Sequence, residues 1–135
     1  MAERYEVREG YLYTRDHEWI KVEDRVITIG ITDYGQSKLR DIVHVELPDI
    51  GESVEEGEVI ATIESIKAVS EIYSPAAGRI IDVNVKLTDN PELVNEDPYE
   101  KGWIVKMELA EERTFGDLME ADEYRRYLED LEEAV

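Results

Sequence analysis

Apolar and polar residues alternate over most of residues 11–110, and a period of two predicts β-strands that bury one face. Residues 18–22 and 25–31 enclose Glu23-Asp24 and predict a hairpin, with Ile27, Ile29 and Ile31 on one face of its second strand. Further strands are expected at 42–47, 58–64, 68–73, 79–85 and 103–109. Turn-forming sequences rich in Pro, Gly and Asp separate these segments, so the pattern predicts a mainly β fold.

Two of these strands have a defined apolar face in the sequence. Alternation places Val59, Ala61 and Ile63 on one face of the strand at 58–64. In the strand at 103–109, the same period places Trp103 on the face of the apolar residues that follow it at every second position. Both faces are therefore expected to pack into the core.

Helical signals occur at two places. The polar segment 32–40 predicts a short helix capped by Thr32 or Asp33. From Thr114 the apolar spacing becomes three or four residues, which predicts an amphipathic helical segment at 114–131. No long linker precedes this segment, so we expect a single domain over residues 1–135, with its core at about 11–110 and the C-terminal helix packed against the strands.

Composition narrows the range of functions. The chain has 34 acidic and 15 basic residues, so its net charge is −19, and this charge disfavours nucleic-acid and membrane partners because both bind through Lys and Arg. The chain contains no Cys and only two His, which argues against a metal site. The N-terminus has no apolar targeting segment, and no apolar run is long enough to span a membrane, so a cytoplasmic location is expected.

The acidic charge is concentrated in two segments. Residues 46–64 contain seven acids and no base, and residues 111–135 contain ten acids and three bases, so each segment has a net charge of −7. A solvated surface that favours solubility is the simplest interpretation. The alternative is a docking field for partners with basic faces.

Lys67 is the only base between Glu46 and Ile72, and it follows Ser65 and Ile66 in the short connection between two predicted strands. A lysine at such a hairpin tip projects into solvent, where the active site of another protein can reach it. An ordinary exposed turn lysine would have the same local sequence. The wider sequence distinguishes between these interpretations.

The segment Glu64-Ser65-Ile66-Lys67-Ala68 resembles the lipoylation tip of the glycine cleavage H proteins. Matches to this family run in order from about Tyr11 to Leu128. They comprise His17-Glu-Trp-Ile20, Gly30-Ile-Thr-Asp33 with Gln36, Asp41-Ile-Val43, Val45-Glu-Leu-Pro48, Tyr73-Ser-Pro75, Gly78, Val83-Asn84, Pro91-Glu-Leu-Val-Asn95, Pro98-Tyr-Glu-Lys-Gly-Trp103, and Leu118-Met119 with Tyr124. The tip alone is a weak signal, whereas an ordered set of this extent is specific.

The resemblance implies a barrel-sandwich hybrid, the β-sandwich of lipoyl and biotinyl domains, with short peripheral helices and a C-terminal helix. It implies a monomeric, non-catalytic carrier with lipoate in amide linkage to Lys67. Such a carrier takes an aminomethyl group from glycine decarboxylase (P protein) to aminomethyltransferase (T protein), and its dithiol is reoxidised by dihydrolipoamide dehydrogenase (L protein). Lipoate-attaching enzymes are further expected partners. The cofactor supplies the reactive group, and the protein supplies its placement.

The resemblance also suggests which residues surround the lipoyl arm. Glu64, Ser65, Ile66 and Ala68 would form the tip around Lys67. The residues expected by position to line a cleft for the loaded arm are Asp16, Glu18, Ile31, Lys38 and Glu71. The sequence departs from the family pattern at Lys38, where His is common, and at Arg40, where Gly is common.

Four alternative functions differ from this carrier role in the sequence features that they require. A biotin carrier places methionine on both sides of its lysine, which Ile66 and Ala68 do not match. A lipoyl domain of a 2-oxoacid dehydrogenase would not explain segments 17–19 and 99–103 or the C-terminal helix. A hydrolase is disfavoured because the chain has neither a G-x-S-x-G motif nor a Gly-rich phosphate loop. An H-like lipoyl donor or relay protein for other lipoate-dependent enzymes stays open, because of the two departures in the first helix.

Overall fold

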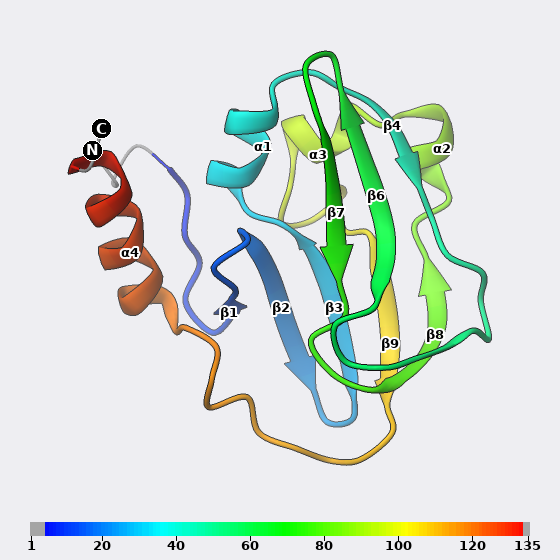
Figure 1. The fold of residues 1–135 in the computed structure, drawn as a ribbon. Coiled ribbons are helices and arrows are strands. Elements are labelled where there is room, and N and C mark those ends of the chain that lie inside the picture. The colour runs from blue at the N-terminus through cyan, green and yellow to red at the C-terminus, as the bar shows by residue number, and fades with distance from the viewer. Residues whose placement is uncertain (1–4, 134–135) are drawn as a thin grey trace.

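A computed structural model describes residues 5–133 and shows two antiparallel β-sheets packed face to face (Figure 1). The larger sheet has the strand order β1-β2-β3-β9-β8-β5, and the smaller has the order β4-β6-β7. The strands of the larger sheet are β1 (Leu12–Tyr13), β2 (Glu18–Glu23), β3 (Val26–Ile31), β9 (Val105–Leu109), β8 (Gly78–Val83) and β5 (Ser53–Val54). Those of the smaller sheet are β4 (Ile42–Glu46), β6 (Val59–Ser65) and β7 (Val69–Tyr73). The expected mainly β barrel-sandwich hybrid is therefore confirmed.

The main core lies between the two sheets and consists largely of the alternating aliphatic residues. Ile27 and Ile29 are fully buried on β3, and Ile63 and Ile72 are buried on the facing strands β6 and β7. Each such side chain contributes about 1.5–3 kcal/mol by leaving water. β3 lies between β2 and β9 in the larger sheet. Thr28, which points to the face opposite Ile27 and Ile29, is only 7% exposed, so the strand is buried on both faces.

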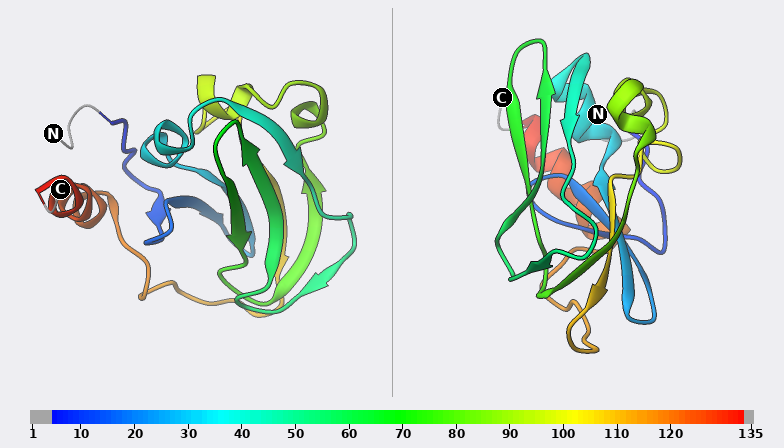
Figure 2. Two further views of the ribbon diagram at one scale, coloured as in Figure 1. Left: turned by 45° about the horizontal axis from the view of Figure 1, so that its top comes forward. Right: turned by 90° about the vertical axis from the view of Figure 1, so that its right-hand side faces the viewer.

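Within residues 5–133, four helices lie around the sheets: α1 (Asp33–Leu39), α2 (Lys86–Asp89), α3 (Leu93–Glu96) and α4 (Ala121–Glu133). Of the two caps predicted for α1, Thr32 and Asp33, the structure has Thr32. The Thr32 Oγ1 accepts a hydrogen bond of 3.1 Å from the Gly35 N–H. α1 and α3 lie near the same end of the sandwich as the β6–β7 hairpin, as Figure 1 shows. The two views of Figure 2 place α4 to one side of the sheets.

An aromatic cluster attaches α4 to the rest of the protein. The rings of Tyr13 and Tyr124 stack with centroids 4.5 Å apart and planes 4° apart. The Tyr124 hydroxyl lies 2.7 Å from the Thr32 Oγ1 and 2.9 Å from the His17 Nδ1. Because Tyr124 is fully buried, these contacts tie α4 to the N-terminus of α1. The C-terminal helix therefore packs against the strand-bearing part of the chain, as predicted.

The structure corrects three details of the predicted elements. The last helix begins at Ala121 rather than Thr114, because the residues before it run alongside β1, where Tyr13 and Met119 exchange two backbone hydrogen bonds. Val59 is 43% exposed because the β6–β7 register shifts between Val59 and Ala61. Trp103 precedes β9, which begins at Val105.

Several short elements were not predicted from the sequence. These are β1, β5, α2 and α3, each two to four residues long. None of the helices between residues 5 and 133 has the length and apolar character needed to cross a bilayer. The proposed single domain covers residues 1–135, of which 1–4 and 134–135 lie outside the described residues.

Candidate functional site

The β6–β7 hairpin has a two-residue tip made of Ile66 and Lys67. The Ser65 N–H donates to the Ala68 carbonyl at 2.8 Å and closes the turn. The Ser65 hydroxyl oxygen also accepts from the Lys67 N–H at 3.3 Å and from the Ala68 N–H at 3.1 Å. Neither Ile66 nor Lys67 has a positive φ, so the turn is not of the primed type that favours glycine. The Ser65 hydroxyl, rather than a glycine conformation, stabilises this turn by accepting hydrogen bonds from the Lys67 and Ala68 N–H groups.

A second set of hydrogen bonds holds the tip against the connection between α1 and β4. The Ile66 N–H donates to the Asp41 carbonyl at 3.0 Å. Asn95 of α3 fixes that connection: its Oδ1 accepts from the Ile42 N–H at 3.0 Å, and its Nδ2 donates to the Arg40 carbonyl at 2.9 Å. A lysine at this tip therefore extends from a backbone that is held on both sides.

Lys67 itself is exposed, and within residues 5–133 its ammonium forms no ion pair or hydrogen bond. Ile66 beside it is 67% exposed, and Glu64 is exposed as well. Ser65 and Ala68 are half-buried by their role in the turn. The five predicted tip residues thus form one protruding unit with a free lysine at its end.

An open groove of about 660 Å³ lies along β7, the edge strand of the smaller sheet. Its other wall is the loop between β1 and β2. The groove is lined by Arg15, Asp16, His17, Val69, Ser70, Glu71 and Tyr73. On the β7 side the groove begins at Val69, two residues after Lys67.

Glu18, one of the predicted cleft residues, does not line the groove and is buried, with 4% of its surface exposed. Its Oε2 accepts from the Tyr73 N–H at 3.2 Å, and its Oε1 lies 3.4 Å from the Thr14 hydroxyl. Burial raises the pKa of Glu18 to about 7, and the negative charge of Asp16 adds to this shift.

The predicted cleft residues have different positions in the structure. Asp16 and Glu71 line the groove. Ile31 is a core residue that pairs with Glu18 across β2 and β3. Lys38 does not line the groove, and its ammonium lies 5.2 Å from the centre of the Tyr34 ring.

Five groove residues were not assigned to it from the sequence: Arg15, His17, Ser70, Val69 and Tyr73. The sequence did contain a signal for Val69 and Tyr73: alternation along β7 places both on the same face as Glu71. His17 also has a structural role, because its Nδ1 lies 2.9 Å from the Tyr124 hydroxyl. Burial lowers the pKa of His17 to about 4, so the ring is neutral at pH 7.

Arg40, the second departure from the family pattern, ends α1 with φ 70° and ψ −152°. This backbone conformation is one that residues with a side chain rarely adopt, and it explains why Gly suits the position. The Arg40 N–H donates to the Gln36 carbonyl at 3.1 Å, which closes the helix. The chain keeps the conformation at the cost of strain.

Known proteins match this chain in both sequence and fold. The family model described as "Glycine cleavage H-protein" matches residues 11–131. A glycine cleavage system H protein of Halothermothrix orenii is 48% identical over 126 residues, which cover 93% of this chain and 98% of that protein. A probable glycine cleavage system H protein of Thermococcus gammatolerans is 50% identical, with coverages of 94% and 96%.

The fold also matches a solved structure. A crystal structure of a glycine cleavage system H protein from Mycobacterium marinum superimposes with a TM-score of 0.83 at 34% identity, covering 91% of this chain and 99% of that chain. Sequence and fold therefore agree over nearly the whole length of the chain. The chain belongs to the glycine cleavage H-protein family.

Proposed function

We propose that this chain is a non-catalytic lipoyl carrier, with lipoate attached through an amide bond to the Nζ of Lys67. In this role it receives an aminomethyl group at glycine decarboxylase, delivers it to aminomethyltransferase, and presents the reduced dithiol to dihydrolipoamide dehydrogenase. The bound lipoyl group supplies the sulfur chemistry, and the chain supplies a rigid support and a surface that each partner recognises.

The observation that carries the proposal is the exposed, unpaired Lys67 at the end of a firmly hydrogen-bonded hairpin. A free ammonium is open to a lipoate-attaching enzyme, since within residues 5–133 it has no ion pair to break. A tip fixed through Ser65 and Asp41 limits movement to the lysine and its cofactor. Such a flexible arm on a fixed base raises the effective concentration of the carried group at a docked active site.

The groove beside β7 supports a second part of the proposal, in which the loaded arm rests between visits to partners. Asp16 and Glu71 are acidic groups on its walls, and the buried Glu18 accepts a hydrogen bond from the Tyr73 N–H of the same wall. The two lining carboxylates attract a protonated amine. Arg15 is the one cation among the residues that line the groove, and it opposes the attraction.

Glycine–bicarbonate exchange with purified glycine decarboxylase tests the carrier role. The lipoylated chain should support exchange, and Lys67→Ala, which cannot be lipoylated, should support none. A matched variant, Lys21→Ala, changes an exposed lysine of β2 and should retain full activity. Absence of exchange with the lipoylated chain would refute the shuttle role.

The same preparation distinguishes the lipoyl donor alternative. If the lipoylated chain fails in exchange but passes its lipoyl group to a 2-oxoacid dehydrogenase domain in the presence of a lipoyl-transferring enzyme, a donor role replaces the shuttle. If exchange occurs and no lipoyl group is transferred, the donor role is excluded under those conditions.

A further inference from the structure

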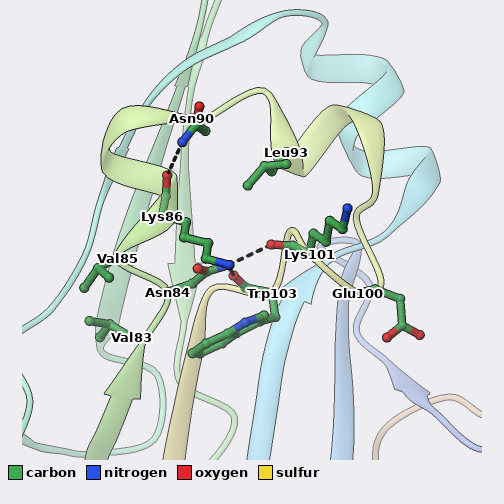
Figure 3. A pocket seen from close by; sticks show the side chains of 9 residues that line it. All are labelled: Val83, Asn84, Val85, Lys86, Asn90, Leu93, Glu100, Lys101 and Trp103. Atoms are coloured by element: carbon green, nitrogen blue, oxygen red, sulfur yellow. Dashed lines mark hydrogen bonds between the residues drawn. The ribbon is translucent and has the colours of Figure 1, made fainter.

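A second cavity, of about 730 Å³, opens where the end of β8 meets α2, α3 and the loop before β9. Figure 3 shows the Trp103 ring on one side of the opening and Leu93 on the other, with Lys86 extending toward the space between them and the Lys101 side chain turned outward at the rim. Val83 extends the apolar wall beside Trp103. The size and the apolar walls are those of a small-molecule site. None of its lining residues belongs to the β6–β7 hairpin or to the groove beside β7.

The walls of this cavity are firmly built. Asn84 is 5% exposed, and its Nδ2 donates to the carbonyls of Lys101 and Trp103 at 2.8 Å each. Gly102 allows the loop to close against α3, because a Cβ there would lie 2.8 Å from the Leu93 carbonyl oxygen. The ring and the two flanking lysines are therefore carried by backbone that is held in place before any ligand arrives.

Among the residues that line this cavity, two lysines outnumber one acid, in contrast to the excess of acids in the chain as a whole. Three of the six lysines, Lys86, Lys101 and Lys106, gather around Trp103, and the Lys106 ammonium lies 5.3 Å from the centre of its ring. In the described part of the chain, neither Lys86 nor Lys101 forms an ion pair. Glu100 is the single acid among the lining residues, and it pairs with Arg8, with its carboxylate directed away from Trp103 in Figure 3.

We propose that this cavity binds a small anionic ligand with a planar ring, the ring between Trp103 and Leu93 and the anionic group between Lys86 and Lys101. An indole face gives a flat apolar partner for a ring. Two unpaired ammonium groups at the rim favour a carboxylate or phosphate, and the electronegative surroundings limit how many such groups one ligand can carry. The Lys106 ammonium lies near the same indole ring but is not among the residues that line the cavity, so it does not occupy the proposed ligand site.

Titration of the ¹⁵N-labelled chain with naphthoate, followed by two-dimensional ¹H–¹⁵N NMR spectra, tests the proposal. The chain has two tryptophans, and only Trp103 lines the cavity, so its indole signal should shift saturably while that of Trp19 stays in place. A dissociation constant of about 1 mM is expected for a ligand of this size. Naphthylmethanol, which lacks the charge, and cyclohexanecarboxylate, which lacks the planar ring, should each bind roughly fivefold more weakly.

Variants locate the binding. Lys86→Gln and Lys101→Gln should each weaken naphthoate binding by about threefold, and the matched Lys21→Gln should leave it unchanged. Lys67→Ala should also bind normally, since the proposal is independent of the carrier role. Equal binding of all three compounds, or equal weakening by Lys21→Gln, would overturn the proposal. Binding of an acidic phenylalanine peptide without any binding of naphthoate would overturn it as well and assign the cavity to a protein partner.

Discussion

Replacing Arg40 by glycine should stabilise the protein. Arg40 has φ 70° and ψ −152°, a region that is essentially confined to glycine, and holding another residue there costs about 1–3 kcal/mol. Glycine relieves this strain but gains freedom in the unfolded chain, which lowers stability by about 0.5–1 kcal/mol. The net expectation for Arg40→Gly is a free energy of unfolding higher by about 1 kcal/mol. For a chain of 135 residues, that corresponds to a rise in Tm of roughly 3–5 °C.

Urea unfolding followed by circular dichroism measures this difference, and Arg40→Ala is the control. Alanine removes the same charge and the same long side chain but keeps the Cβ, so the backbone strain persists and stability should stay near that of the starting protein. The hydrogen bonds of the Arg40 N–H and carbonyl, to Gln36 and Asn95, do not depend on the side chain. If Arg40→Gly is no more stable than the starting protein, or if Arg40→Ala gains as much, the strain argument is refuted.

Three further predictions follow from buried contacts. Burial raises the folded-state pKa of Glu18 to about 7, so the folded protein holds this proton more tightly than the unfolded chain, and the contribution of Glu18 to stability should fall by roughly 3 kcal/mol as pH rises from about 4.5 to above 7. The lowered pKa of His17 changes stability in the opposite direction, so the measurement is the difference in free energy of unfolding between the starting protein and Glu18→Gln, which should change by this amount across that range. Asn95→Ala should cost about 2–3 kcal/mol by removing hydrogen bonds to Ile42, Arg40 and Gln36, and Asn95→Asp should cost at least as much, because it keeps the acceptor for Ile42 but sets a carboxylate oxygen against the Arg40 and Gln36 oxygens; urea unfolding measures both differences. Gly30→Ala should lower the free energy of unfolding by about 1–3 kcal/mol, because its Cβ would lie 2.5 Å from the buried Trp19 ring; unchanged stability would show that the ring can move.

The elements with a strong local signal were predictable from the sequence. The alternating isoleucines of residues 25–31 gave β3, and Thr32 before a polar run gave the cap of α1. The start of α4 was not predictable by spacing, because Phe115, Leu118 and Met119 fit an extended segment as well as a helix. Their conformation is decided by pairing with Tyr13, more than 100 residues away in the chain.

The hairpin lysine was predictable from local sequence and resemblance, but its surroundings were not. The groove brings together Asp16 and Glu71, which belong to segments far apart in the sequence. Lys38 was also predicted to line the groove from its position in the sequence, but its ammonium lies over the Tyr34 ring and outside the groove. The positive φ of Arg40 was also hidden, because a residue type alone does not reveal a strained backbone.

The central claim is that Lys67 carries lipoate, and intact-mass and peptide mass spectrometry of the chain isolated from its native host test it most directly. The account predicts one lipoyl group on the chain, located on Lys67 and missing from Lys67→Ala, while Lys21→Ala is modified normally. An unmodified Lys67, in cells whose 2-oxoacid dehydrogenases are lipoylated, would contradict it.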